Sequence, residues 1–177
     1  VNVKDYDIET LRNKVGIVMQ KAVLFKGTIR ENMWMGKKGA TDEQIDEALE
    51  ISQSKEFVDS KQGRLDYVIE QGGKNLSGGQ RQRLTIARAI VRKPDVLILD
   101  DSASALDFAT DAALRKAIRG MNNSPTVFIV SQRAASLMYA DLIIVLDDGQ
   151  VAGMGTHDEL LANCEVYKAV SYTHLRA

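Results

Sequence analysis

The segment Leu76-Ser77-Gly78-Gly79-Gln80 stands directly before an Arg-rich stretch with helical periodicity. Two glycines and a serine at the start of a helix leave backbone N–H groups exposed, and the positive end of the helix dipole favours an anion such as phosphate. The same residues are also typical of a flexible Gly-Gly loop in which serine caps the following helix. The pentapeptide therefore predicts a phosphate site, but by itself it does not exclude a plain helix cap.

A second segment suited to phosphate chemistry follows that helix. Val96 to Leu99 is uninterrupted apolar sequence and is followed by Asp100 and Asp101, which is typical of a strand buried on both faces of a parallel sheet. A carboxylate at this strand end can hold Mg²⁺ beside the phosphates of a nucleotide, whereas a lone aspartate there can also be a solvated residue. The order of the motifs, with Ser104 to Asp107 next, favours the nucleotide site.

Periodicity in the rest of the chain predicts the elements that position these motifs. Apolar residues at helical spacing and the capping-box pairs Thr41/Gln44 and Thr156/Glu159 predict helices over about 42–52, from 80 to before Pro94, over about 108–119 and after Thr156. Short apolar runs predict strands over 15–19, 96–99, 126–130 and 142–146, with a hairpin turn at 147–149. Small helices and loops fill the middle region. Strands that alternate with helices indicate an α/β fold with ligands beyond the carboxyl ends of the strands.

The composition is that of an ordinary globular domain. The 177 residues are 45% hydrophobic and 27% charged, and 23 Lys and Arg stand against 24 Asp and Glu, which excludes a disordered tail, a collagen-like repeat and a strong field toward nucleic acid. The single Cys164 and two histidines provide neither an internal disulfide nor a zinc site, so we expect a reducing compartment. The apolar runs are far shorter than the roughly 20 residues of a membrane span, so we expect the chain as given to be soluble.

In this order and spacing, the motifs resemble those of the nucleotide-binding domain of an ATP-binding cassette (ABC) transporter of the exporter type. The resemblance spans residues 1–170. It implies an α/β fold with a P-loop NTPase-like ABC ATPase core, in which a parallel sheet is flanked by helices, and a small α-helical subdomain. It assigns residues 1–20 and about 95–170 to the core, and about 21–94 to the helical subdomain and the signature helix.

The resemblance also implies a role for each motif, with ATP and Mg²⁺ as cofactors. The segment from Leu76 to Gln80 is the signature, and 71–73 matches the exporter X-loop loosely, with Gln71 where Glu is usual. Val23 to Asn32 is similar to the segment that receives the membrane domain. The implied nucleotide-binding residues are Gln20 of the Q-loop, Ser77, Gly78, Gly79 and Gln80 of the signature, and Asp107 of the D-loop at the dimer interface; the implied Mg²⁺ ligands are Asp100 of Walker B and Gln20.

Two positions depart from the family pattern. Asp101 stands where the family has its catalytic Glu, and a carboxylate withdrawn by one methylene can lower the rate roughly 10²-fold. Gln132 stands at the switch position, where His is usual, and a glutamine can bond a γ-phosphate but cannot carry a positive charge. Together, Asp101 and Gln132 resemble the degenerate catalytic site of heterodimeric exporters. Independent drift in a hydrolytic domain is the alternative.

The pattern G-x-x-x-x-G-K-[ST] does not occur in the sequence. Because every later motif is in family order, we expect an N-terminal truncation, and a fragment that is inactive alone for lack of a P-loop. Residues 171–177, SYTHLRA, resemble translated sequencing-adaptor sequence and are expected to be a non-native tail.

The resemblance predicts an ATP-hydrolysing cassette that couples ATP-driven domain dimerisation to transport. Its expected partners are a second nucleotide-binding domain, in a heterodimer, and a transmembrane domain contacted near Gln20 to Asn32, at the cytoplasmic side of the cell membrane. A non-transport ABC ATPase and a regulatory module that binds ATP without hydrolysis remain alternatives. A nucleic-acid binder is least favoured, because the arginines after Gln80 match the polar face of a helix and no aromatic residues are interleaved with them.

Overall fold

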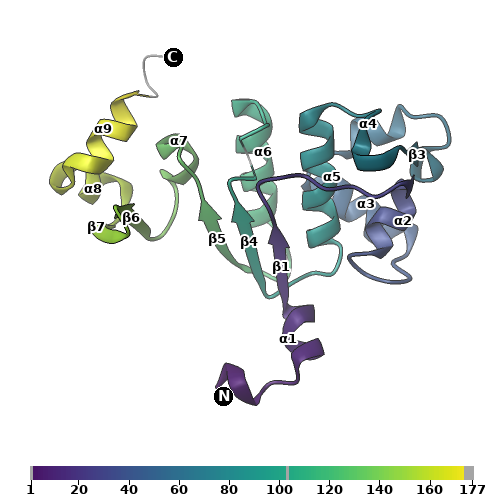
Figure 1. Cartoon of the computed structure of the whole chain (residues 1–177), viewed down its shortest axis with the longest axis horizontal. Helices are drawn as coiled ribbons and strands as arrows, with labels where there is room; N and C mark the ends of the chain where they lie inside the picture. The colour runs from purple at the N-terminus through teal and green to yellow at the C-terminus, as the bar shows by residue number, and fades with distance from the viewer. Residues whose placement is uncertain (1, 103, 174–177) are drawn as a thin grey trace. The chain divides into compact units, whose positions relative to one another are not determined.

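The computed structural model describes residues 2–102 and 104–173 (Figure 1). They form two compact units that divide after Val130. No helix in the described part of the chain is long and apolar enough to cross a membrane.

A parallel sheet of three strands organises the first unit, and it confirms the predicted α/β fold. β1 (Val15–Val18) and β5 (Thr126–Val130) flank the central β4 (Val96–Asp100). Val15 lies opposite Val96, and Asp100 lies opposite Val130. The strands therefore start and end together, and their carboxyl ends lie along one edge.

One face of this sheet is buried and the other is not, so the prediction of a strand buried on both faces is wrong for β4. Leu97 and Leu99 are buried in a core that includes side chains of α5 (Gly78–Ile90) and α6 (Phe108–Arg119). The opposite face carries Ile98, which is only half-buried, between Ile17 at 55% and Phe128 at 56% exposure. A run of apolar residues in the sequence does not reveal whether other elements cover both faces of the strand.

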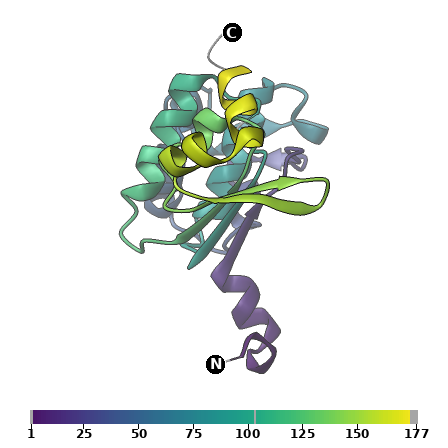
Figure 2. The same cartoon turned by 90° about the vertical axis from the view of Figure 1, so that its left-hand side faces the viewer.

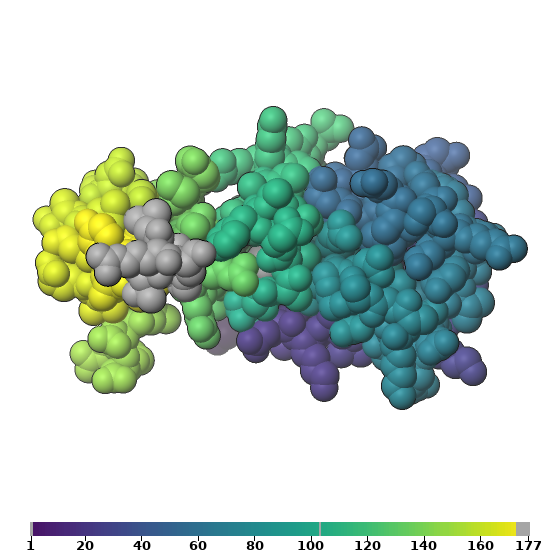
Figure 3. All heavy atoms as spheres, turned by 90° about the horizontal axis from the view of Figure 1, so that it is seen from above, coloured from purple at the N-terminus to yellow at the C-terminus, as the bar shows by residue number. Residues whose placement is uncertain are grey.

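A helical region lies between β1 and α5 along the chain. Its elements are β2 (Gly27–Thr28), α2 (Ile29–Trp34), α3 (Asp42–Ile51), α4 (Lys55–Asp59), η2 (Arg64–Asp66), β3 (Val68–Ile69) and η3 (Gln71–Gly73). The predicted helix and its Thr41/Gln44 capping box are confirmed in α3. Figure 3 shows this region, in blue, as a closely packed mass at one end of the first unit.

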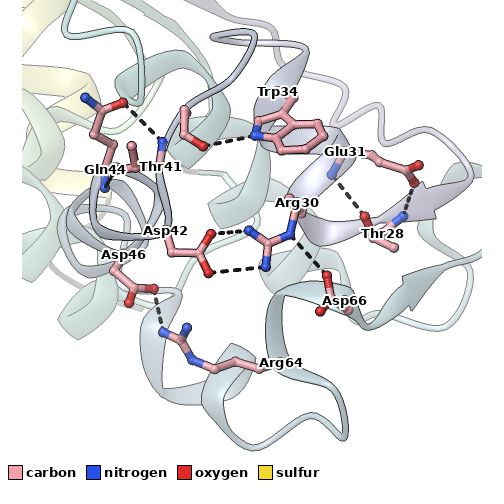
Figure 4. A network of polar contacts seen from close by, with 11 residues as sticks. Thr28, Arg30, Glu31, Trp34, Thr41, Asp42, Gln44, Asp46, Arg64 and Asp66 are labelled. Atoms are coloured by element: carbon pink, nitrogen blue, oxygen red, sulfur yellow. Dashed lines mark hydrogen bonds and ion pairs between the residues drawn. The ribbon is translucent and has the colours of Figure 1, made fainter.

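An arginine holds the helical region together (Figure 4). Arg30 of α2 forms an ion pair with Asp42 at the start of α3 and donates from Nε to Asp66 of η2 at 3.1 Å. Trp34 donates from its indole N–H to the Ala40 carbonyl at 3.0 Å. These contacts fix α2 against the segments that follow it. Along the chain, η1 (Val3–Asp5) and α1 (Ile8–Lys14) precede β1.

The described part of the second unit contains a hairpin and three helices. Its elements are α7 (Ala134–Leu137), β6 (Ile143–Asp147), β7 (Gln150–Gly155), α8 (His157–Asn163) and α9 (Glu165–Thr173). The predicted turn is confirmed: Asp148 and Gly149 have φ of 46° and 75°, which suits a tight hairpin, and Figure 2 shows the two strands as a long ribbon. Thr156 and Glu159 form the predicted capping box. The helix α9 runs through Thr173, and residues 174–177 of the expected tail lie outside the described residues.

Candidate functional site

The carboxyl edge of the parallel sheet brings two predicted site residues together. Gln20 follows β1 and Asp101 follows β4, and these strands are neighbours. The side-chain amide of Gln20 donates from Nε2 to Oδ2 of Asp101 at 2.9 Å. Because the donor is the amide nitrogen, Oε1 of Gln20 remains available as an acceptor or metal ligand.

The backbone at Asp101 takes the left-handed conformation, with φ of 41°. Aspartate is among the few residues that tolerate this region. The Asp101 N–H donates to the Val130 carbonyl at 2.9 Å, and the Asp101 carbonyl accepts from the Ser104 hydroxyl at 2.9 Å. These bonds hold the sharp turn after β4.

The signature segment, Leu76 to Gln80, forms the start of α5. The helix begins at Gly78, two residues before the predicted start, because Ser77 caps it. Gln80 N donates to Ser77 Oγ at 3.2 Å, and Ser77 N donates to Gln80 Oε1 at 3.0 Å. Among the described residues, the N–H groups of Gly78 and Gly79 have no hydrogen-bond partner in the protein, as expected for a first helical turn. Free N–H groups beside a serine cap fit both a phosphate site and a plain helix cap, so the phosphate site stays a prediction.

The signature segment also touches the segment after Walker B. A Cβ placed on Gly79 would lie 3.3 Å from the carbonyl oxygen of Ala105. Asp107, two residues later, caps α6 by accepting from Thr110 N at 2.9 Å and Thr110 Oγ1 at 2.8 Å. These hydrogen bonds lower the pKa of Asp107. The structure therefore shows Asp107 as a helix cap, and its role at a dimer interface stays a prediction.

Two further predicted site residues are Asp100 and Gln132. Asp100 ends β4 and is half-buried. Gln132 is exposed and belongs to the second unit, so its role beside Asp101 stays a prediction. Within residues 2–102 and 104–173, no three His, Cys, Asp or Glu side chains cluster as a metal site.

The arginines of α5 are more buried than the predicted polar helix face implies. Arg83 donates to the Gln53 carbonyl at 2.6 Å, and its guanidinium lies over the Phe57 ring at 5.2 Å. Arg88 donates to the Val23 carbonyl at 2.9 Å. Burial lowers the pKa of both guanidinium groups. These side chains tie α5 to neighbouring loops and do not form a basic surface.

Sequence reasoning missed two residues that shape the loop before the signature segment. Arg81 Nη1 donates to the Leu76 carbonyl at 2.7 Å. Asn75 Nδ2 donates to the Val68 carbonyl at 2.9 Å. Both residues stand directly beside the glycine-rich segment from Leu76 to Gln80. That position was the available signal that their side chains could bond to its backbone.

A family model described as "ABC transporter" matches residues 1–104. The chain belongs to the ABC transporter family. The predicted resemblance is therefore confirmed at the level of the family.

Similar ABC proteins match along nearly the whole chain. The uncharacterized ABC transporter ATP-binding protein YfiB of Bacillus subtilis (strain 168) is 44% identical over 168 residues, which are 95% of this chain and 29% of that protein. A Staphylococcus aureus (strain NCTC 8325 / PS 47) protein, whose name describes a multidrug export ATP-binding/permease protein, is 37% identical over 174 residues, or 98% of this chain and 29% of its own length. The chain thus spans about three tenths of the length of these relatives.

A solved structure agrees with the ABC fold. The structure of a bacterial Atm1-family ABC exporter with ATP bound has a TM-score of 0.89 and 32% identity to this chain, covering 96% of this chain and 30% of the exporter chain. The predicted core fold, a parallel sheet flanked by helices, is confirmed by this likeness.

Proposed function

We propose that the chain is the ATP-binding and ATP-hydrolysing cassette of an ABC exporter, with its own catalytic site degenerate and its signature segment completing the site of a partner domain. The observation that carries this proposal is Asp101 at the family's Glu position, hydrogen-bonded to Gln20. The likeness to an ATP-bound exporter supports the choice of nucleotide. We propose the same division as the resemblance implies, with core residues in 1–20 and about 95–170 and the helical subdomain in about 21–94.

The side chains of Asp100 and Gln20 fit a magnesium ion. Mg²⁺ takes one or two protein ligands and completes its shell with water and phosphate oxygens, so a larger acidic cluster is not needed. The contact with Asp101 leaves Oε1 of Gln20 unused by that hydrogen bond, and Asp100 offers a carboxylate. Held by these residues, the ion would neutralise negative charge on the phosphates of the nucleotide.

Asp101 is poorly placed to activate water. Its side chain is one methylene shorter than Glu, and a misplacement of about 1 Å can lower the rate 10²-fold. Oδ2 already accepts a hydrogen bond from Gln20, so one of its lone pairs is not available to a water molecule. We therefore assign slow turnover to the site of this chain, with Gln132 as a neutral contact to the γ-phosphate.

The signature segment is suited to the nucleotide of a partner domain. The N–H groups of Gly78 and Gly79 together with the helix dipole favour a phosphate. Ser77 Oγ accepts from Gln80, which leaves its own O–H to donate. The segment is thus competent to complete the partner's site even though Asp101 weakens the chain's own.

Two further partners belong to the proposal. The P-loop does not occur in residues 1–177, and we propose that another part of the transporter polypeptide supplies it. The segment from Val23 to Asn32 is proposed to meet the transmembrane domain at the cytoplasmic face of the membrane. Exposed Val23 and Phe25, at 46% and 50%, support that contact, because exposed apolar side chains gathered on one segment are typical of interaction sites.

Nucleotide analysis of the assembled transporter tests the proposal. After a single turnover with labelled ATP and rapid removal of free nucleotide, the site of this chain should retain ATP while the partner's site holds ADP. ADP in equal amounts at both sites would contradict the degenerate assignment. ATP retained at both sites would contradict the proposal that the assembled transporter hydrolyses ATP at the partner's site.

A further inference from the structure

The loop before α5 is held by one arginine from within the helix. Arg81 Nη1 donates to the Leu76 carbonyl at 2.7 Å and to the Gly73 carbonyl at 3.3 Å. Gly73 also accepts from Leu76 N at 3.0 Å. The guanidinium therefore closes the loop onto the first turn of the helix that follows it.

These contacts fix the peptide unit between Leu76 and Ser77 at both of its ends. Its carbonyl accepts from Arg81, and its N–H donates to Gln80 Oε1 at 3.0 Å. A peptide unit is planar, so bonds at both ends determine its orientation. The peptide unit thereby sets where the helix start begins, and the hydrogen bond from Gln80 N to Ser77 Oγ, at 3.2 Å, orients the hydroxyl on it.

The backbone of the loop leaves room for the arginine. Gly73 has φ of 70°, and a Cβ there would lie 2.7 Å from Cδ of Arg81. Glycine meets both demands, because it adopts positive φ at little cost and has no Cβ. The far end of the loop is anchored separately, since Asn75 Oδ1 accepts from Glu70 N at 3.0 Å and its Nδ2 donates to the Val68 carbonyl.

We infer that Arg81 is a positioning residue for the signature segment: it orients the Ser77 hydroxyl and the N–H groups of Gly78 and Gly79 toward a phosphate of the partner's ATP. This inference rests on the proposed function. The guanidinium acts through the loop carbonyls, so its removal should weaken the affinity of the signature segment for phosphate. A purely structural arginine would change only the stability of the fold.

Arg92 provides the matched control. It follows the same helix and donates to the carbonyls of Gly36 at 3.2 Å and Arg12 at 2.9 Å. Arg81→Met and Arg92→Met therefore remove the same kind of contact at opposite ends of α5. Both should lower the melting temperature, and only Arg81→Met should affect the signature segment.

Amide hydrogen exchange in the 177-residue chain gives the first measurement. Arg81→Met should speed exchange at Ser77 by about tenfold, because local opening sets the exchange rate of a bonded amide. Arg81→Lys keeps one donor and should recover part of the protection. Equal exchange at Ser77 in Arg81→Met and Arg92→Met would overturn the inference.

ATP-driven closure of the assembled transporter gives the second measurement, followed as a distance between labels on the two nucleotide-binding domains. Arg81→Met should raise the ATP concentration for half-maximal closure by about tenfold over Arg92→Met, with Arg81→Lys between them. If the Arg81→Met and wild-type assemblies close at the same ATP concentration, the inference about Arg81 is contradicted and the proposed function is not. A wild-type assembly that does not close with ATP contradicts the proposed function, and the inference with it.

Discussion

The amide of Gln20 donates a hydrogen bond of 2.9 Å to the carboxylate of Asp101. The two residues are 81 positions apart in the chain and meet because β1 and β4 are parallel neighbours in register. The bond orients the Gln20 amide with its nitrogen toward Asp101 and its oxygen elsewhere. The bond leaves Oε1 of Gln20 free of Asp101 and occupies Oδ2 of Asp101.

Asp101→Glu should increase ATP turnover at the site of this chain by about tenfold or more, because the longer side chain restores the reach of the carboxylate. The measurement is ATPase activity of the assembled transporter with the partner's catalytic Glu replaced by Gln. Asp101→Asn is the control and should give no increase. Equal ATPase activity of the Asp101→Glu and Asp101→Asn variants would show that the length of the side chain at position 101 does not limit hydrolysis.

Gly78→Ala should separate phosphate binding from stability. Among the described residues beyond its own helix backbone and chain neighbours, a Cβ at Gly78 meets Nη2 of Arg81 alone, at 3.9 Å. Alanine therefore fits and should raise stability by up to about 0.5–1 kcal/mol through helix propensity. The methyl group nonetheless projects where backbone must approach phosphate, so ATP-driven closure should require about tenfold more ATP.

Gly120→Ala is the control for Gly78→Ala, because Gly120 ends α6 and a Cβ there would be in ordinary contact at 3.5 Å. Thermal unfolding and ATP-driven closure should both be measured for the two variants. If Gly78→Ala closes at the wild-type ATP concentration, close approach of phosphate to this helix start is not needed.

Acid should weaken the helical region. The hydrogen bond from Arg30 lowers the pKa of Asp42 from 3.8, and the one from Arg64 lowers that of Asp59. A carboxylate whose pKa is lower in the folded state stabilises the fold above its unfolded pKa and loses this contribution as the pH falls through the folded value. The free energy of unfolding in urea should therefore fall as the pH drops below about 4.

Asp42→Asn should make that acid dependence shallower. Glu50→Gln on the same helix is the control, since Glu50 is exposed and forms no ion pair among the described residues. An identical pH dependence in wild type and Asp42→Asn would show that the Arg30 contact does not contribute to stability.

The open face of the parallel sheet should drive self-association of the isolated chain. Ile17, Ile98 and Phe128 lie side by side across the three strands, and such apolar rows favour contact with other molecules. Phe128→Ser should reduce concentration-dependent association in sedimentation velocity. Val68→Ser, at a similarly exposed position on β3, should leave it unchanged, and equal effects of both substitutions would argue against a specific face.

Local patterns predicted those elements whose formation depends on neighbours in sequence. The capping boxes at Thr41 and Thr156 and the turn at Asp148 and Gly149 are set within a few residues, and the structure contains all three. The exposure of Phe128 was not predictable, because it depends on what packs against a sheet face.

The candidate site shows the same division. The family resemblance named Leu76 to Gln80, Gln20 and Asp101 as site residues, and only the structure shows that Gln20 and Asp101 are in contact. The contacts of Arg81 with Leu76 and Gly73 were missed, because periodicity assigns an arginine to the polar face of a helix. Only the backbone path of the preceding loop shows that this side chain turns back toward carbonyl groups.

ATPase activity of the assembled transporter tests the central claim most directly, with one catalytic carboxylate removed at a time. Asp101→Asn should leave turnover near the wild-type rate, whereas Gln in place of the partner's catalytic Glu should reduce it by about 10²-fold or more. The opposite pattern, with Asp101→Asn abolishing turnover or the partner substitution leaving it near wild type, would contradict a degenerate site in this chain.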